Sequence, residues 1–372
     1  TVTQRRALAR DVGARSITML RNENAALPLK PGLRRLCVLG PLSDAAAEMR
    51  GPWGAAGEPE GQVSMLAGLR ASLPYTDIAH AMGVAIDDTD TAGIDAAVAL
   101  CDGADALLLC LGERANMSGE AASRAFPELP GQQATLARAA IERARSHGMP
   151  VVAILFSGRP LIVPWLNDNV DALLAAWFAG CEAGHAITDV LTGRVSPSGR
   201  TPISWPRALG QVPIFFGQRP SGRPMEALDH FTSKYLDVPN DPLYPFGHGL
   251  SYGRITYANL RMTTDTLGER DVVEISVDVS NEGGREAEET VFLFTRDKVA
   301  SVTRPLLELR GFAKIRLEPG RTGTVGMSLA AAELRFLDAE LRSVFEPGEV
   351  EVLVGPCADR AQLLPATLRL VG

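Results

Sequence analysis

The stretch of sequence that decides the fold is ALLLCLGERANMSGEAASR, residues 106–124. Its first part, 106–111, is apolar throughout, which is typical of a parallel strand covered on both faces. The polar loop that follows carries Glu113, Glu120 and two arginines. Ligands of open α/β sheets bind beyond the carboxyl ends of such strands. Both glutamates are therefore candidates for catalytic groups, although a loop glutamate is more often only a solvated charge.

Apolar runs alternate with helical periodicity from the start of the chain to about residue 205. Further strands are predicted at 36–40, 151–156 and 172–178, and helices at about 62–73, 94–102, 131–146 and 184–192. A first helix is predicted at the start of the chain, with apolar positions at Ala7, Val12, Ile17, Met19 and Leu20. This alternation predicts βαβ units and a mostly parallel α/β sandwich domain over 1–205.

A connector at 206–254 follows, in which proline, glycine and aromatic residues accumulate. A free linker rarely carries so much aromatic area, so we expect this connector to pack along a surface. From 255 to 372 the hydrophobic period is two: Val273, Ile275, Val277 and Val279 alternate with polar residues. Short strands are also predicted at 291–295, 323–329, 349–355 and 366–371. Their spacing predicts an antiparallel β-sandwich of the fibronectin or immunoglobulin kind.

Composition and charge exclude several classes of protein. The chain of 372 residues is long enough for two domains, and its formal charge of −7 argues against a nucleic-acid partner. It contains no apolar run of about 18 residues that would span a membrane. The five cysteines are far apart in sequence and lie in apolar patterns, so we interpret them as core residues. The chain opens at Thr1 without a methionine or a targeting signal, which leaves two alternatives open: a piece of a longer polypeptide or a natural short protein.

Four further features of the sequence bear on possible sites. Glu182 and His185 have the spacing of half a carboxylate-bridged metal site, but without a second pair a capping or packing role is favoured. Ser157 follows a buried strand without the glycine that a nucleophile elbow needs, so a serine hydrolase is not expected. No glycine-rich nucleotide-binding motif follows the first strand. Trp53, in a glycine-rich loop, either stacks on a sugar or packs at a domain contact.

These motifs together resemble the C-terminal two domains of bacterial family 3 glycoside hydrolases, particularly the periplasmic β-glucosidases. The resemblance covers the chain in order from Thr1 to Gly372. The matching segments are SITMLRNE (16–23), LPL (27–29), GPWGAAG (51–57), GEAASR (119–124), LPGQ (129–132), WFAG (177–180) with Glu182, PSGR (197–200) and YPFGHGLSY (244–252).

The resemblance implies a retaining β-glucosidase whose acid/base lies in this chain and whose nucleophile lies elsewhere. The family supplies an aspartate nucleophile from an N-terminal (β/α)8 barrel, which this chain does not match. Carried over by motif, the general acid/base is Glu120, and Glu113 has a supporting electrostatic or hydrogen-bonding role. Arg124 either pairs with a loop carboxylate, contacts substrate or is an ordinary surface arginine. Hydrolysis with retention of the anomeric configuration needs two carboxyl groups about 5 to 5.5 Å apart, so Glu120 alone cannot catalyse the reaction.

Several expectations about partners follow from the same resemblance. The substrate is a β-glucoside or oligosaccharide, the missing barrel is a partner in the same or another chain, and the location is the periplasm or outside the cell. No cofactor and no metal are expected. Without a barrel, exposed apolar surface predicts dimerisation or aggregation. The alternative is a non-catalytic carbohydrate-binding or scaffolding module of the same fold, and the Glu120 loop is the feature that distinguishes the two.

Overall fold

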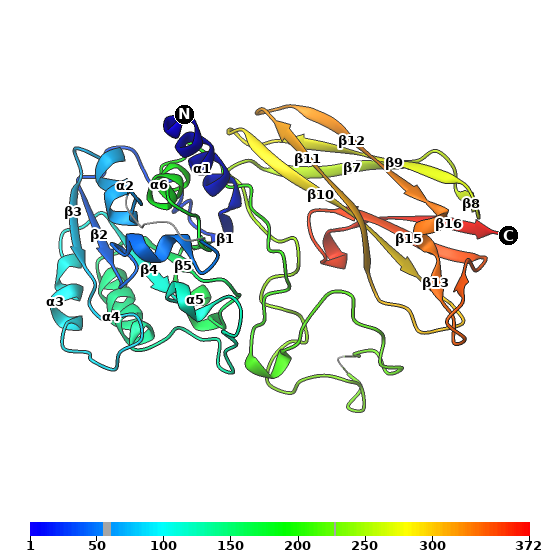
Figure 1. The fold of residues 1–372 in the computed structure, drawn as a ribbon, viewed down its shortest axis with the longest axis horizontal. Helices are drawn as coiled ribbons and strands as arrows, with labels where there is room; N and C mark the ends of the chain where they lie inside the picture. Colours follow the sequence, from blue (N-terminus) through cyan, green and yellow to red (C-terminus); the bar gives the residue numbers. More distant parts are fainter. Residues whose placement is uncertain (55–60, 227) are drawn as a thin grey trace. The chain divides into compact units, whose positions relative to one another are not determined.

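The computed structural model describes residues 1–54, 61–226 and 228–372 (Figure 1). The chain forms two compact units. Unit 1 comprises Thr1–Arg200 and Pro206–Leu209, and unit 2 comprises Thr201–Trp205 and Gly210–Gly372. The connector expected at 206–254 is thus divided between the two units, most of it belonging to unit 2. Positions 55–57 of the glycine-rich motif lie outside the described residues.

Unit 1 is built on a six-stranded sheet in the order β1-β6-β5-β4-β2-β3. Neighbouring strands run parallel, except that β1 pairs antiparallel with β6. β4 and β5 are buried at every position, as their apolar runs predict. The predicted mostly parallel sheet is therefore confirmed. The strands are β1 (Thr18–Asn22), β2 (Arg35–Leu39), β3 (Asp77–Ala81), β4 (Ala106–Gly112), β5 (Val151–Phe156) and β6 (Ala172–Ala175).

Helices cover both faces of this sheet. In Figure 1, α1, α2 and α6 lie on one face and α3, α4 and α5 on the other. α2 and α6 approach closely, because a Cβ added to Gly68 would lie 2.2 Å from the carbonyl oxygen of Gly184. The helices are α1 (Val2–Ser16), α2 (Met65–Ser72), α3 (Ile94–Val98), α4 (Gln133–Ser146), α5 (Pro164–Asn169) and α6 (Ala183–Leu191), with 3-10 turns η1 (Ala46–Arg50), η2 (Ala99–Cys101) and η3 (Ala115–Met117).

The first helix differs from its predicted form. It ends at Ser16, so Ile17, Met19 and Leu20 are not its apolar positions; Met19 and Leu20 are buried in strand β1 instead. Val12 is 56% exposed, and the helix buries only Gly13 and Ala14. The β-branched pair Ile17-Thr18 favours extended backbone, and pairing with β6 satisfies the hydrogen bonds of this segment.

Three other elements of unit 1 departed from expectation. Strand β3 has a half-buried, mixed sequence with Asp77 and His80, so it lacks the apolar run that reveals a buried strand. Helix α5 has only six residues, too few for a clear helical period. The strand predicted at 172–178 ends at Ala175, and Trp177 has a φ of 53°, which is incompatible with a strand.

Unit 2 contains a β-sandwich of a five-stranded sheet (β11-β10-β15-β16-β8) and a three-stranded sheet (β12-β9-β7). All its strand pairs are antiparallel except the short pair of β16 with β8. The alternating positions of β9, from Val273 to Val279, are buried in the core between the sheets. The fibronectin-like sandwich predicted from the period of two is confirmed.

The elements of unit 2 and the connector are bounded as follows. The strands are β7 (Ile255–Met262), β8 (Thr266–Gly268), β9 (Val272–Asn281), β10 (Ala287–Asp297), β11 (Glu308–Leu317), β12 (Thr322–Ala330), β13 (Phe336–Leu337), β14 (Ser343–Val344), β15 (Gly348–Gly355) and β16 (Leu364–Val371). The 3-10 turns are η4 (Leu209–Gln211), η5 (Ala331–Leu334) and η6 (Arg360–Gln362).

Part of the aromatic connector packs on the five-stranded sheet, as expected. Phe216 and Phe246 lie with ring centroids 4.7 Å apart, and both contact Phe294 of β10 in a second buried cluster. Other connector residues do not follow the expectation, since Phe231 is 74% and Leu228 is 96% exposed. Burial of connector aromatics is therefore confirmed for Phe216 and Phe246, and for Tyr244, which packs against Trp205.

Candidate functional site

The candidate site lies where the strand order of the unit 1 sheet reverses. The chain passes from β2 outward to β3 and then returns to β4 on the other side of β2. Ligands of open α/β sheets bind outside the carboxyl ends of the strands at such a point. The loop that leaves β2 carries Trp53, and the loop that leaves β4 carries Glu113 and Glu120. The same loop carries Arg124, so the topology brings all four predicted site residues to one edge of the sheet.

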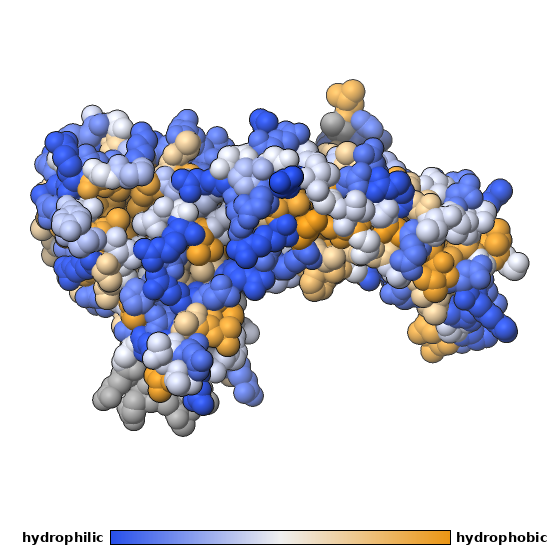
Figure 2. All heavy atoms as spheres, turned by 90° about the horizontal axis from the view of Figure 1, so that it is seen from above, coloured by the Kyte–Doolittle hydropathy of each residue, from blue (hydrophilic) through white to orange (hydrophobic). Residues whose placement is uncertain are grey.

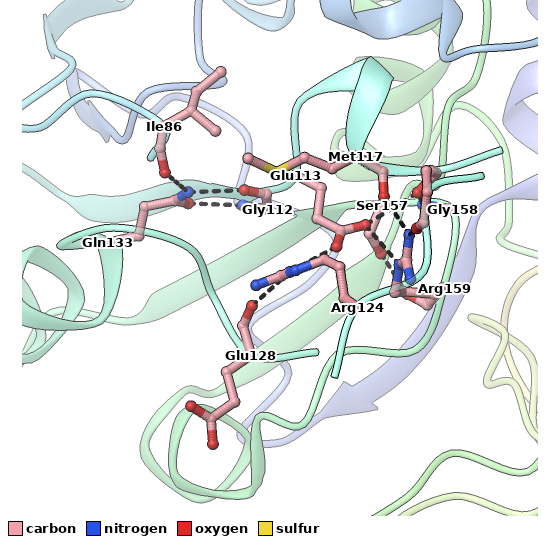
Figure 3. A network of polar contacts seen from close by, with 12 residues as sticks. Ile86, Gly112, Glu113, Met117, Arg124, Glu128, Gln133, Ser157, Gly158 and Arg159 are labelled. Atoms are coloured by element: carbon pink, nitrogen blue, oxygen red, sulfur yellow. Dashed lines mark hydrogen bonds and ion pairs between the residues drawn. The ribbon is translucent and has the colours of Figure 1, made fainter. Parts of the chain in front are cut away.

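Glu113 directly follows β4, and its side chain is fully buried. One carboxylate oxygen accepts from Arg124 Nη1 at 2.6 Å, and the other accepts from Arg159 Nε at 3.2 Å and from the Ser118 hydroxyl at 3.1 Å. Figure 3 shows both guanidinium groups pointing toward this carboxylate. A buried carboxylate is tolerated only when it is paired and hydrogen-bonded. Glu113 therefore holds its own loop together and does not face solvent.

Arg124 pairs with a loop carboxylate, which is one of the three roles that the sequence leaves open for it. Its Nη1 contacts Glu113 and also donates to the backbone oxygen of Glu128 at 2.9 Å (Figure 3). The side chain is 22% exposed. Arg124 thus connects Glu113, at the start of the loop that leaves β4, to Glu128 near its end.

Arg159 belongs to the same network, although no sequence argument above selected it. It follows β5, and its Nη2 donates to the carbonyl oxygen of Met117 (Figure 3). The same Nη2 donates to the carbonyl oxygen of Ala122 at 2.6 Å. A signal for it does exist in the sequence. Because β4 and β5 are both apolar parallel strands, polar residues directly after each of them meet at the same edge of the sheet.

The base of the loop is fixed by a glutamine at the start of α4. The fully buried Gln133 accepts from the Gly112 amide and donates to the carbonyl oxygens of Gly112 and Ile86, each at 2.8 Å. These bonds hold the last residue of β4 immediately before Glu113 (Figure 3). The sequence motif LPGQ, which ends at Gln132, stops one residue short of this anchor.

Glu120 lies at the exposed tip of the loop. Both of its neighbours have positive φ angles, 99° at Gly119 and 58° at Ala121. An alanine rarely adopts this backbone region, which costs of order 1 kcal/mol and persists only where surrounding contacts impose it. Within the described part of the chain, the Glu120 carboxylate has no hydrogen-bond or ion-pair partner. The loop is anchored on both sides of a carboxylate that remains available to a ligand.

Trp53 lies beside the same loop. A Cβ added to Gly158 would lie 3.1 Å from Trp53 Cη2, and one added to Gly119 would lie 3.1 Å from the Pro52 side chain. The indole packs at an angle of 65° against Phe178, with ring centroids 6.3 Å apart. It nevertheless stays 67% exposed. One edge of Trp53 is therefore packed while much of its surface is open for stacking.

The weaker sequence candidates have structural partners. Glu182 forms an ion pair with Arg6 at 2.5 Å and contacts His185 Nδ1 at 2.7 Å, which fits the packing role favoured for this pair. Among residues 1–54, 61–226 and 228–372, no group of three or more His, Cys, Asp or Glu side chains is placed to hold a metal ion. The Ser157 hydroxyl is buried and donates to the Arg159 carbonyl oxygen at 2.6 Å, an arrangement unlike that of a nucleophile.

The surface is mixed in character. Figure 2 shows polar and apolar residues interspersed over one face. Large exposed apolar side chains do occur near the site, at Trp53 and Phe126, and in the connector at Leu228 and Phe231. In the described residues, no helix has the length and apolar character needed to cross a bilayer. Dimerisation through the exposed apolar surface stays a prediction.

Comparison with known families finds two matches along the chain. The glycosyl hydrolase family 3 C-terminal domain matches residues 17–252, and a fibronectin type III-like domain matches residues 289–358. The chain belongs to glycosyl hydrolase family 3. The resemblance inferred from the sequence motifs is therefore confirmed.

Similar proteins are glycosidases of this family. The chain is 35% identical to the periplasmic β-glucosidase of Salmonella typhimurium and 33% identical to a β-xylosidase of Formosa agariphila, each over 98% of this chain. The crystal structure of a β-glucosidase from Listeria innocua in complex with isofagomine superposes with a TM-score of 0.92 at 31% identity over 100% of this chain. A β-glucosidase structure from Erythrobacter marinus gives a TM-score of 0.88 at 33% identity over 99% of this chain.

The chain spans about half the length of these relatives. It covers 50% of the Salmonella and Formosa proteins, 50% of the Listeria structure and 51% of the Erythrobacter structure. The other half of each relative has no counterpart among these 372 residues.

Proposed function

We propose that this chain is the acid/base-bearing portion of a retaining β-glucosidase, with Glu120 as the general acid/base. The observation that carries the proposal is the contrast between the two loop glutamates. Glu113 is fully buried and paired with two arginines, so a substrate cannot reach its carboxylate oxygens. Glu120 is exposed and unpaired within the described residues, at the switch point of the sheet. Proton transfer to a substrate requires a carboxyl group that a ligand can reach.

The nucleophile in this proposal comes from a (β/α)8 barrel in the same or another chain. In the first step the Glu120 carboxyl group gives its proton to the glycosidic oxygen while the barrel carboxylate attacks the anomeric carbon, and the carbon–oxygen bond breaks. In the second step the Glu120 carboxylate takes a proton from the water that attacks the same carbon, which releases the nucleophile. The half-length match to the relatives supports this division of the two carboxyl groups.

Trp53 is proposed to contact the sugar on the leaving-group side of the scissile glycosidic bond. Its exposed indole lies beside the Glu120 loop, and the apolar face of a pyranose stacks on such a ring. Terminal β-linked glucose is the proposed substrate because the Salmonella, Listeria and Erythrobacter relatives are named β-glucosidases. The name of the Salmonella relative also supports a periplasmic or secreted location. Arg124 and Glu113 support the loop and do not contact substrate in this proposal.

The experiment compares Glu120→Gln with Glu113→Gln in this chain joined to a family 3 barrel. Glu120→Gln keeps the shape of the side chain but removes the proton, so alkyl β-glucosides, whose leaving oxygen needs protonation, should react 10²- to 10⁴-fold more slowly. Dinitrophenyl β-glucoside has a leaving group that needs no proton, so it should form the glycosyl-enzyme at nearly the parent rate. Azide needs no deprotonation, so it should restore turnover and yield the β-glucosyl azide.

The control is the chain without a barrel. It should release no phenol from an aryl β-glucoside at pH 5 to 7 beyond the level of its Glu120→Ala variant. Turnover above that level would contradict the proposed division. Azide rescue of Glu113→Gln, with Glu120→Gln behaving like the parent, would move the acid/base to Glu113. Sugar binding without any turnover in the barrel-containing protein would favour the non-catalytic carbohydrate-binding alternative.

A further inference from the structure

The Arg159 guanidinium lies beneath the loop that carries Glu120. Its Nη2 donates to the carbonyl oxygen of Met117 and to that of Ala122, the latter at 2.6 Å. In sequence these two carbonyls stand three residues before and two residues after Glu120. One guanidinium group therefore bridges the two sides of the short segment whose tip is the proposed acid/base.

This bridge replaces regular secondary structure. Between Glu113 and Arg124 the only regular element is the 3-10 turn η3, and the backbone reverses direction through two residues with positive φ. Such a loop has few hydrogen bonds of its own, so its shape depends on groups outside it. A guanidinium group presents five N–H donors in a fixed plane and can hold two carbonyls and a carboxylate together. A lysine ammonium group cannot reproduce this planar arrangement.

The arginine is itself held in place by buried neighbours. Its Nε donates to Glu113, which directly follows β4, and the preceding Gly158 amide donates to the Ser118 hydroxyl at 3.2 Å. Ser118 in turn donates to Glu113. A Cβ on Gly158 would lie 2.7 Å from the Ser118 side chain, so the chain after β5 also touches the loop directly. These contacts fix the position of the loop relative to β4 and β5, two fully buried strands of the sheet.

We propose that Arg159 is a positioning residue that sets the location of the Glu120 carboxyl group by clamping the Met117 and Ala122 carbonyls. This inference rests on the proposed role of Glu120. Its consequence is specific to proton transfer, because a misplacement of about 1 Å in a reacting group can cost about 10²-fold in rate. Sugar stacking on Trp53, on a different loop, should be little affected.

The first test uses the chain itself and needs no activity. Hydrogen–deuterium exchange is measured by mass spectrometry in Arg159→Met, Arg159→Lys and the control Arg143→Met, which removes an exposed arginine of α4 paired with Asp102. Arg159→Met should speed exchange of the 117–123 amides at least tenfold, with strand β4 unchanged. Arg159→Lys should give an intermediate effect, and Arg143→Met none. Unchanged exchange at 117–123 in both Arg159 variants would overturn the proposal.

The second test uses the barrel-containing protein. Arg159→Met should lower kcat for an alkyl β-glucoside about 10²-fold, lower the glycosylation rate with dinitrophenyl β-glucoside less than fivefold and leave KM within threefold. A purely structural role would lower both rates by the same factor, since only the folded fraction would change, and that result would overturn the inference. Should Arg159→Met not fold, Arg159→Lys must show the same selective loss in weaker form, and an equal loss on both substrates would likewise overturn it.

The two proposals fail in different ways. If Glu120→Gln shows no dependence on the leaving group, the proposed function is wrong, whatever the exchange measurement gives. If Glu120→Gln shows that dependence and the Arg159 variants do not, only the positioning role of Arg159 is wrong.

Discussion

Replacement of Gln133 by leucine tests whether the base of the candidate loop is held as the structure indicates. The substitution nearly keeps the volume but removes three hydrogen bonds of 2.8 Å, to the Gly112 amide, the Gly112 carbonyl and the Ile86 carbonyl. A buried polar group left without a partner costs about 1 to 3 kcal/mol. With three such groups, partly offset by about 1 kcal/mol from the buried leucine methyls, we expect a net loss of about 3 kcal/mol in the free energy of unfolding.

The assay is unfolding of unit 1, followed by tryptophan fluorescence and by calorimetry. Three of the four tryptophans, Trp53, Trp165 and Trp177, belong to this unit. For a unit of this size a loss of 3 kcal/mol corresponds to a fall in Tm of roughly 6 to 12 °C. Gln133→Glu should destabilise at least as much at pH 7, because it places a carboxylate against two carbonyl oxygens.

The matched control is the neighbouring Gln132. Among the described residues, its side chain forms one hydrogen bond, which its Oε1 accepts from the exposed Thr135 hydroxyl. Gln132→Leu should therefore change the free energy of unfolding by no more than about 0.5 kcal/mol. A loss below about 1 kcal/mol in Gln133→Leu, or one no larger than in Gln132→Leu, would refute the reasoning that buried hydrogen bonds fix the end of β4.

Two other predictions concern stability, one in each unit. Burial raises the pKa of Asp171, but a backbone amide and the Arg145 guanidinium outweigh it and hold that pKa below its usual range. The carboxylate therefore stabilises the fold above about pH 4, so Asp171→Asn should cost about 2 kcal/mol at pH 7 and progressively less below pH 4 in urea unfolding. In unit 2, Phe294→Ala should lower the free energy of unfolding by about 3 to 5 kcal/mol, because Phe294 is fully buried. The loss should appear in the calorimetric transition that Gln133→Leu leaves unchanged. The exposed Phe312→Ala is the control and should lower the free energy of unfolding by less than about 1 kcal/mol.

Periodicity predicted the elements that are buried on a regular face. β4 and β5 are apolar at every position because both faces of a central parallel strand are covered, and β9 alternates because one face of a sandwich strand is solvated. Hydrophobic periodicity does not predict the elements whose burial is irregular. The apolar residues of strand β1 continue the helical spacing of α1 and so predict helix, and only the pairing of β1 with β6 shows that it is extended.

The sequence also points to Glu113, Glu120, Arg124 and Trp53, but local sequence does not show which of them are buried. Two glutamates seven positions apart in one polar loop look alike in sequence, yet one is fully buried and the other exposed. The difference arises because Arg124 and Arg159 both point to Glu113, and Arg159 comes from another strand, 46 positions away. Local sequence carries no information on such a distant partner.

What the sequence by itself determined is the order of the two domains, the parallel and antiparallel character of their sheets, and the family of the protein, because these follow from hydrophobic periods and short motifs that are local in the chain. What only the tertiary structure decided is which polar groups meet. Gln133 reaches the end of β4, Cys37 and Cys101 bring their sulfur atoms to 3.5 Å across 64 positions, and Arg159 reaches the carbonyls on both sides of Glu120. Each of these contacts depends on strand order and crossover, which bring together residues that no period or spacing along the chain relates.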